Sequence, residues 1–287
     1  MFDHALRTFD QKEELGTPRS VLSFNALLMA CKADQVPKMF TEISEKYKIS
    51  LDKVSYGLLV RSYCESGSPK SGLTVLKEMK EKNVEITAIT YTILLDAFNK
   101  KECIEEADKI WKEMAEKGLL DVTAFNVRIM QTGPPEDVLS LIDEMKTLGL
   151  IPDAVTYNNL LICYCNHGLI EEDKKVYENF AENKCVPNVA TFTNFIYHLC
   201  KNGDVDKGFE VFKDSLKRDK LPNFTSMKYL VHGLFEKSKL EEAKQVIDIA
   251  KKKCRPNFLN MWKKIERDLG LNVKKQPAPI ETSSLPA

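Results

Sequence analysis

Cysteine and histidine are the residue types in this chain that most readily bind metals or catalyse reactions. The sequence has eight cysteines and four histidines. No two cysteines are separated by two residues, and the closest pair, Cys163 and Cys165, alternates between two sides of a helix. No Gly-x-Ser-x-Gly, P-loop or Gly-x-Gly-x-x-Gly motif occurs. We therefore expect no metal site, no cofactor, no catalytic residue and no small-molecule substrate, so the chain is not predicted to be an enzyme.

Three cysteines occupy one recurring position instead. Cys64, Cys165 and Cys200 each follow an aromatic residue by eight positions. A cysteine that is not a ligand packs as a small hydrophobe, and unpaired thiols are typical of a reducing compartment. These three side chains are therefore expected to fill a packing position between helices.

The basic residues could contact phosphate groups. The 42 Lys and Arg residues are balanced by 42 Asp and Glu residues, so the overall positive charge typical of nucleic-acid-binding proteins is missing. Basic residues nevertheless gather near the C-terminus, opposed only by Glu266 and Asp268. The cluster consists of Lys251, Lys252, Lys253, Arg255, Lys263, Lys264, Arg267, Lys274 and Lys275. It predicts a phosphate-binding end, and a solvated helix surface is the alternative.

The elements that position these residues repeat along the chain. A leading residue, usually aromatic and usually followed by a small polar residue, recurs at intervals of 32 to 35 residues. It stands at Phe24, Tyr56, Tyr91, Phe125, Tyr157, Phe192, Met227 and Met261. A period of this length is typical of stacked supersecondary units.

Each unit has the hydrophobic spacing of two amphipathic helices, for example from Tyr91 to Phe98 and from Ala107 to Met114. Ser55, Thr90, Thr156 and Thr191 precede the hydrophobic stripe of the first helices and are predicted to be N-caps. Gly67, Gly168 and Gly203 follow these helices at positions suited to a left-handed cap, and Pro152, Pro187, Pro222 and Pro256 end four units. The pattern predicts an all-α protein, an α-solenoid of stacked helix-turn-helix repeats.

The units resemble the pentatricopeptide repeat. Unit five reads AVTYNNLLICYCNHGLIEEDKKVYENFAENKCVPN, unit six reads VATFTNFIYHLCKNGDVDKGFEVFKDSLKRDKLPN, and unit seven contains KLEEAKQVI and ends in CRPN. Asp173 departs from the small residue that the family has where the helices cross, and units one and four are about three residues short, which predicts tightened turns between their helices. The opening VLSFNALLMACK resembles short plant mitochondrial members, several of which are ribosome-associated.

The resemblance divides the chain into seven numbered repeats. Residues 21–52, 53–87, 88–121, 122–153, 154–188, 189–223 and 224–257 are repeats 1 to 7. Residues 1–20 look like the second helix of a preceding repeat, 258–270 like a capping helix, and 271–287 like a disordered tail. No transit segment precedes the first repeat in this sequence, which we read as a processed or truncated form.

In the family, two residues of each repeat face one base: the residue after the leading aromatic and the last residue of the repeat. These pairs are Asn25 with Asp52, Gly57 with Thr87, Thr92 with Asp121, Asn126 with Asp153, Asn158 with Asn188, Thr193 with Asn223, and Lys228 with Asn257. The resemblance implies that Asn with Asp reads U, Thr with Asp reads G, Asn with Asn reads a pyrimidine and Thr with Asn reads A. The expected order is 5′-U-N-G-U-Y-A-3′, read by side chains on an exposed concave face of first helices. Polar residues there are also usual in any soluble solenoid.

Phosphate contacts are expected from lysines nine residues after the leading aromatic, Lys100 and Lys201, and from the basic end at Lys251, Lys252, Lys253, Arg255, Lys263 and Lys264. Three functions compete. The chain is a structural component of a mitochondrial ribosome that contacts ribosomal RNA and ribosomal proteins, a sequence-specific organellar transcript-binding protein, or a protein-binding helical scaffold. We favour the first, in the mitochondrial matrix and without a membrane partner.

Overall fold

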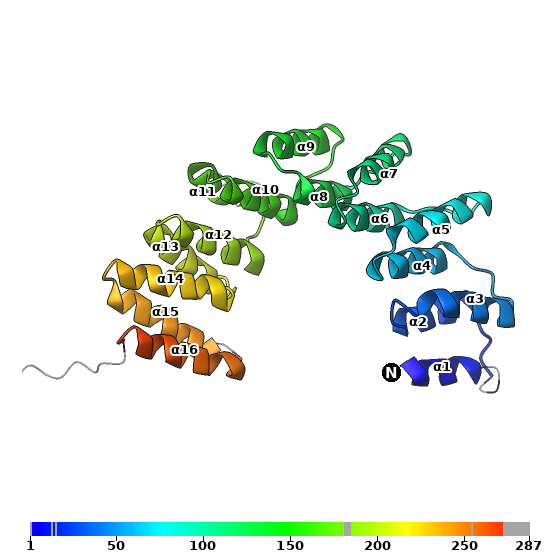
Figure 1. Ribbon diagram of the computed structural model, residues 1–287, viewed down its shortest axis with the longest axis horizontal. Coiled ribbons are helices and arrows are strands. Elements are labelled where there is room, and N and C mark those ends of the chain that lie inside the picture. The colour runs from blue at the N-terminus through cyan, green and yellow to red at the C-terminus, as the bar shows by residue number, and fades with distance from the viewer. Residues whose placement is uncertain are drawn as a thin grey trace, which may run out of the picture. The chain divides into compact units, whose positions relative to one another are not determined.

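The computed structural model describes residues 2–12, 14, 16–178, 180, 185–253 and 255–271. In these residues all regular structure is helical (Figure 1). The first helices of the repeats are α2 (Val21–Ala30), α4 (Lys53–Glu65), α6 (Ala88–Lys100), α8 (Val122–Gln131), α10 (Ala154–Asn166), α12 (Val189–Lys201) and α14 (Phe224–Glu236). The second helices are α3 (Val36–Tyr47), α5 (Pro69–Glu81), α7 (Ile104–Glu116), α9 (Pro135–Thr147), α11 (Ile170–Glu178), α13 (Val205–Lys217) and α15 (Leu240–Lys253). A helix flanks the repeats at each end, α1 (Phe2–Asp10) and α16 (Pro256–Asp268).

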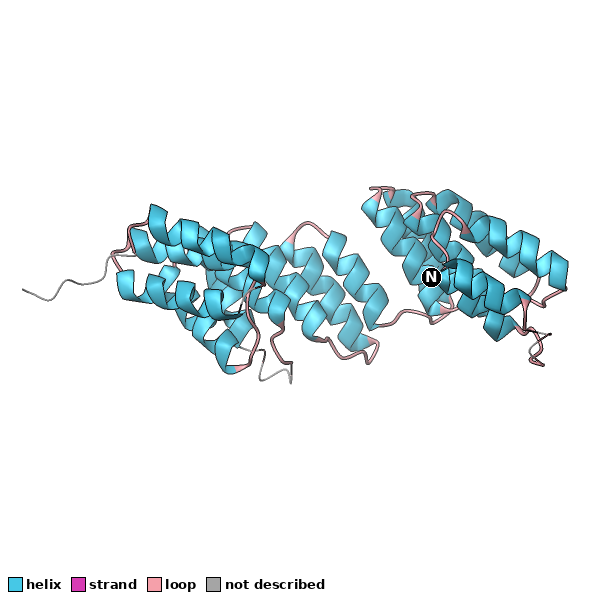
Figure 2. Cartoon of the chain, turned by 90° about the horizontal axis from the view of Figure 1, so that it is seen from below, coloured by secondary structure: helices cyan, strands magenta, loops and turns pink. Residues whose placement is uncertain are grey.

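The chain divides into two compact units, Met1–Asn159 and Leu160–Ala287, with the boundary inside α10. Short loops connect the helices, as the secondary-structure colouring shows (Figure 2). The predicted disordered tail, from residue 272 onward, lies outside the described residues. Leu271, which we had placed in that tail, is only 6% exposed.

Within each unit the helices form two layers. In the first unit, α2, α4, α6 and α8 pack in sequence against one another, and each contacts its own second helix. In the second unit, α12 and α14 pack together in the same way over α13 and α15. A single helix pair cannot bury its apolar face alone, so each repeat depends on its neighbours. The two-layer stack is the predicted all-α solenoid arrangement.

The first helices begin three residues earlier than the hydroxyl pattern predicted. The N-caps are the last residues of the preceding repeats, such as Asp52 and Asn188, which accept from the backbone N–H groups of Ser55 and Thr191. Ser55 and Thr191 are the third helical residues and bond back to the N-cap N–H, forming capping boxes. The prediction that Ser55, Thr90, Thr156 and Thr191 are N-caps was therefore wrong, because short polar residues that can cap a helix stand both at the N-cap and three positions later.

The short repeats 1 and 4 lose part of a helix and not part of a turn. Their first helices, α2 and α8, have 10 residues, whereas α4, α6, α12 and α14 have 13. The residues that end them, Cys31 and Thr132, are extended. The expected tightened turns were wrong, since the missing three residues amount to nearly one helical turn.

Burial confirms most of the leading positions and corrects one. Phe24, Tyr56, Tyr91, Phe125, Phe192 and Met227 are at most 2% exposed. Tyr157 is only half-buried. In α16, which follows repeat 7, the leading position belongs to Trp262, which is fully buried, and not to Met261, which is 45% exposed. Trp262 packs its ring edge-on against Phe224 at 4.9 Å, which attaches α16 to repeat 7.

Repeat 5 carries an acid where the two helices cross. The equivalent positions in the other repeats with full-length first helices are Gly72, Ala107, Gly208 and Ala243. Asp173 is fully buried there and accepts a hydrogen bond from the Cys165 thiol, while its Oδ1 has no partner. Burial raises the pKa of Asp173 to about 7. This repeat therefore buries a carboxyl group that finds only one weak donor.

Candidate nucleic-acid interface

Most residues predicted to face bases after the leading aromatic are nearly buried. Asn25 is 5% exposed, Asn158 6%, and both Thr92 and Asn126 8%. Thr193 is partly exposed. The expectation of short polar side chains on an open face was therefore wrong for four repeats, because neighbouring first helices pack beside these positions. Only an edge of each of these four side chains is available to a ligand.

The two Asn–Asp pairs are built alike. The Asn25 amide donates to Asp52 Oδ1 at 3.1 Å, and Asn25 Oδ1 accepts from the Ser55 hydroxyl at 2.6 Å. In repeat 4 the Asn126 amide donates to Asp153 Oδ1 at 3.1 Å, and Asn126 Oδ1 accepts from Thr156 at 2.7 Å. Each amide is thus fixed in one orientation, which leaves one N–H of its NH₂ group for a base.

The last residue of each of repeats 1 to 6 caps a helix, whereas Asn257 of repeat 7 lies inside α16, whose N-cap is Arg255. Asp52, Thr87, Asp121, Asp153, Asn188 and Asn223 all accept from backbone N–H groups in the first turn of the next first helix. Asp, Asn and Thr are favoured N-caps. The recurrence of Asp and Asn at this position is therefore explained by helix capping, and by itself it gives no information about base reading.

The capping carboxylates carry negative charge. Burial alone would raise the pKa of Asp52 and of Asp153, but the hydrogen bonds they accept reverse the shift and lower both pKa values. The donors include the amide of Asn25 or Asn126 and two backbone N–H groups, those of Val54 and Ser55 for Asp52 and those of Val155 and Thr156 for Asp153. Both groups are ionised at neutral pH, on the side of the molecule where RNA was expected.

The remaining pairs differ from these two. Thr92 donates its hydroxyl to the Ala88 carbonyl of its own helix at 2.9 Å, and Asp121 caps α8. Thr193 Oγ1 accepts from the backbone N–H of Asn223 at 3.2 Å. Asn158 lies in the first unit, where its Oδ1 has no hydrogen-bond partner.

The predicted phosphate-binding residues fall into two groups. Lys100 pairs with Asp96 at 2.6 Å, Lys251 with Glu266 at 2.7 Å and Lys253 with Asp219 at 2.7 Å. Phosphate must compete with these carboxylates. Lys201, Lys252, Arg255, Lys263 and Lys264 are exposed and form no ion pair with the described residues. The second group lies entirely in the second unit.

The exposed side of the first helices, which we call the first-helix face, carries the residues two, five and nine positions after the leading residue. In the first unit its cations are already neutralised: Arg61 pairs with Glu65 at 3.0 Å, and Lys100 pairs with Asp96. The capping carboxylates of Asp52, Asp121 and Asp153 border this face. Its electrostatic character in the first unit is acidic.

The sequence analysis missed an aromatic pair on the first-helix face of the second unit. Tyr197 of α12 and Tyr229 of α14 meet edge to face, with ring centroids 4.8 Å apart, and Tyr229 is 43% exposed. They stand five and two positions after their leading residues. Comparing those two positions across the repeats would have shown that only these repeats have an aromatic residue there.

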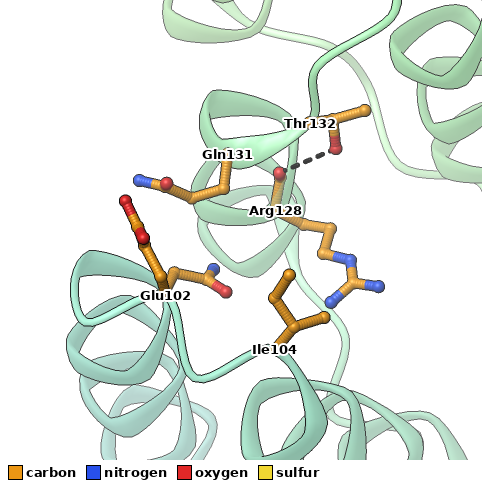
Figure 3. Close-up of a pocket in the computed structure, with 6 residues that line it drawn as sticks. Glu102, Ile104, Arg128, Gln131 and Thr132 are labelled. Atoms are coloured by element: carbon orange, nitrogen blue, oxygen red, sulfur yellow. Dashed lines mark hydrogen bonds between the residues drawn. The ribbon is translucent and has the colours of Figure 1, made fainter.

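A hollow lies between α6 and α8, where α8 ends early. Its volume is about 330 Å³, and Figure 3 shows Arg128 and Gln131 facing Glu102 and Ile104 across it. Arg128 forms an ion pair with Asp108 at 2.6 Å, and Asn99 Nδ2 has no hydrogen-bond partner. None of the predicted site residues lines this hollow.

Metal sites and membrane-spanning helices are absent from the described residues. No group of three or more His, Cys, Asp or Glu side chains there could hold a metal ion. None of the described helices has the combined length and hydropathy required to span a bilayer. The polar and charged residues on the first helices and at the basic end are therefore the candidates for a binding role.

Comparison with known proteins places these features in a family. Models of the PPR repeat family match residues 51–100 and 152–201, and those of the PPR repeat match 89–119 and 190–219. The small ribosomal subunit protein mL103 of Arabidopsis thaliana is 47% identical over 97% of this chain and 70% of its own length. A mitochondrial pentatricopeptide repeat-containing protein of the same plant is 44% identical over 99% of this chain and 69% of its own length.

A solved structure has the same fold. The crystal structure of the pentatricopeptide repeat protein PPR10, from maize, in complex with an 18-nt psaJ RNA element aligns with 94% of this chain at a TM-score of 0.56 and 17% identity. The chain spans 41% of that protein. At this identity the likeness shows that both are helical repeat stacks.

Proposed function

The chain belongs to the pentatricopeptide repeat family, and from this premise we propose that it is a non-catalytic, RNA-binding component of the small subunit of a mitochondrial ribosome. The observation that carries the proposal is the 47% identity, over nearly the whole chain, to a protein named as a small ribosomal subunit protein. The second relative, at 44% identity, is named as mitochondrial, which supports the location.

The distribution of charge supports binding inside a ribonucleoprotein particle. One end of the second unit carries exposed cations that form no ion pair within the described part of the chain, Lys252, Arg255, Lys263 and Lys264. A free RNA strand that follows all seven repeats needs cations along all of them, because phosphate contacts dominate RNA affinity. The first-helix face of the first unit lacks such cations. We infer that the C-terminal end contacts ribosomal RNA and that the acidic first-helix face of the first unit contacts ribosomal proteins.

Sequence-specific transcript binding is the second candidate. It is supported by the identical construction of the two Asn–Asp pairs, each with one amide N–H still available. The capping role of the last residue in repeats 1 to 6 argues against it. Because capping already explains that residue, only the residue after the leading aromatic remains as independent support for a base code. The third candidate, a protein-binding scaffold without RNA contact, leaves the unpaired cations at the C-terminal end without a role.

Sedimentation of a mitochondrial extract tests the proposal. The full chain, carrying a tag, is followed through a sucrose gradient at low salt and at high salt. Migration with the small ribosomal subunit at both salt concentrations is the expected result, because an integral component is held by more than screened charge. Migration with free transcripts supports the second candidate, and migration free of RNA contradicts RNA binding altogether.

A further inference from the structure

The first-helix face of repeats 6 and 7 forms a hollow whose lining residues include none of the Asn and Thr residues predicted to face bases. Its volume is about 490 Å³, and it lies entirely within the second unit. The lining side chains that bear on its chemistry are Lys201 of α12 and Lys228, Tyr229, His232 and Glu236 of α14. It combines an aromatic ring with two lysines, and Glu236 is the only acidic residue among the lining residues.

The ring of Tyr229 is held in place and is accessible. Tyr197 meets it edge to face at 83° with centroids 4.8 Å apart, and Tyr197 also meets the His198 ring edge-on at 5.1 Å. An edge-to-face contact covers at most one face of each ring, so one face of Tyr229 stays free of Tyr197. With 43% of its surface exposed, Tyr229 is available for stacking without prior rearrangement.

Two lysines line the same hollow as this ring. Lys228 precedes Tyr229 in the chain and is exposed, and Lys201 Nζ lies 6.0 Å from the centroid of the Tyr197 ring. Neither lysine forms an ion pair with the part of the chain that the structure describes, in contrast to Lys100 at the position of Lys201 in repeat 3. An accessible ring in a hollow that is also lined by two lysines matches a nucleotide, which offers a flat base and an anionic phosphate.

The corresponding positions of the other repeats lack this combination. Two positions after the leading residue stand Ala26, Leu58, Ile93, Val127, Asn159 and Asn194, and Tyr229 is the only aromatic residue. Lys228 also replaces the short polar residue that follows the leading aromatic in repeats 3 to 6. Repeat 7 is thus unsuited to reading a base edge by short side chains, but it is suited to stacking on a base.

We propose that Tyr229, supported by Tyr197, stacks on one base of single-stranded RNA, and that Lys201 and Lys228 in the same hollow bind the adjacent phosphates without regard to base identity. The inference rests on the proposed RNA-binding function and specifies where on the first helices that binding is strongest. A sequence-independent site suits a ribosome component, because its position is set by the particle and not by a sequence search.

The test measures how tightly the full chain binds a fluorescein-labelled 12-nucleotide single-stranded RNA, in one mixed sequence and its scramble. Tyr229→Leu removes the ring and is expected to weaken binding about 10-fold, equally for both sequences, since base–aromatic stacking contributes 1–3 kcal/mol. Tyr229→Phe keeps the ring and is the matched control, with affinity near that of the wild type. In the double variant Lys201→Gln with Lys228→Gln, the slope of log affinity against log salt concentration is expected to become shallower by about 0.7 for each lysine removed.

Irradiation with RNA carrying 5-iodouridine gives a direct readout, and the expected photoproduct is a peptide that contains Tyr229. If the wild type binds RNA but Tyr229→Leu binds equally well, the stacking site is refuted and the proposed RNA-binding function stands. If the wild type binds no RNA, both are refuted. If Tyr229→Leu weakens binding to a labelled oligo-glutamate peptide and leaves RNA affinity intact, the site binds an acidic protein, and the stacking proposal is refuted.

Discussion

The two units present first helices of the same architecture and opposite chemistry. In the first unit, the cations of the first-helix face are paired with acids of their own helices, and the capping residues Asp52, Asp121 and Asp153 add negative charge. In the second unit the caps of α12 and α14 are neutral asparagines, and Lys201 and Lys228 lie beside two tyrosines.

The difference shows that the repeat specifies a scaffold and not a binding activity. Asp and Asn cap a helix about equally well, so exchanging one for the other changes the charge of the surface and leaves the fold intact. Two positions after the leading residue the side chain also varies, since Ile93 is partly buried against the core whereas Tyr229 is 43% exposed. The charge and the exposed side chains of each unit can therefore differ while the packing of its helices stays the same.

The largest expected effect is on the stability of the basic end. Trp262→Ala removes a fully buried ring that contacts Phe224 and should lower the free energy of unfolding of the second unit by about 3–5 kcal/mol. Denaturation by urea, followed by circular dichroism, measures it. Met261→Ala, at an exposed neighbour, should stay within about 0.5 kcal/mol. A larger loss of stability for Met261→Ala than for Trp262→Ala would show that Met261, and not Trp262, is the buried leading residue of α16.

The buried acid of repeat 5 should give the second unit a pH dependence. The pKa of Asp173 is about 7 in the folded chain, above its unfolded value of 3.8, so folding is favoured by protonation. The contribution of Asp173 to stability is therefore most favourable below pH 4, declines as the pH rises towards 7, and is constant above that. Asp173→Ala should remove this loss and stabilise the protein by about 1–3 kcal/mol at pH 8.

Urea denaturation at pH 5 and pH 8 measures the difference. Asp173→Asn is the matched control, because it removes the titration and keeps a buried polar group, so it should abolish the pH dependence with little gain in stability. Parallel pH profiles for the wild type and Asp173→Ala would mean that this carboxyl is not desolvated.

The capping role of the last residue in a repeat is tested at Asp52. Asp52→Ala removes the acceptor for the Val54 and Ser55 N–H groups and the partner of Asn25, and should cost about 1 kcal/mol. Asp52→Asn keeps an acceptor and should be close to neutral. Thermal unfolding of both variants distinguishes these outcomes, and equal stability of Asp52→Ala and the wild type would leave base reading as the reason for this residue.

Neutralising the caps should make the first unit resemble the second. Asp121→Asn with Asp153→Asn keeps both caps and removes two negative charges, so RNA affinity at low salt should rise about two- to threefold, as for weak solvent-exposed charges. The gain should vanish at high salt because the charges are screened. Fluorescence anisotropy with single-stranded RNA at two salt concentrations measures it. An unchanged affinity at low salt would mean that RNA does not approach the first unit.

The smallest expected effect concerns base identity. If the paired residues read bases, Thr193→Asn with Asn223→Asp should move the preference at repeat 6 from A towards U, because the pair then matches those of repeats 1 and 4. We expect about a twofold change, measured with 5′-U-N-G-U-Y-A-3′ RNA against the same strand ending in U, since much of the affinity is sequence-independent. Equal affinities before and after the exchange would exclude direct base reading there.

The sequence by itself determined the repeat architecture. The leading aromatics, the glycines with positive φ at Gly67, Gly168 and Gly203, and the prolines between repeats identified helix pairs, because hydrophobic period and backbone preference act locally. Errors arose where two residues satisfy the same local rule. Asp52 and Ser55 are both capping types, and Met261 and Trp262 are both apolar, so one-dimensional spacing could not decide between them.

Only the tertiary structure decided which polar side chains are available to a ligand. The sequence predicted Asn25, Thr92, Asn126 and Asn158 to be open, and the packing of adjacent first helices nearly buries them. It also grouped Lys100 with Lys201, yet Asp96 one turn away neutralises the first, whereas no described acid pairs with the second. Exposure and ion pairing depend on neighbours across the helix layer, and their distances are not encoded in the spacing along the chain.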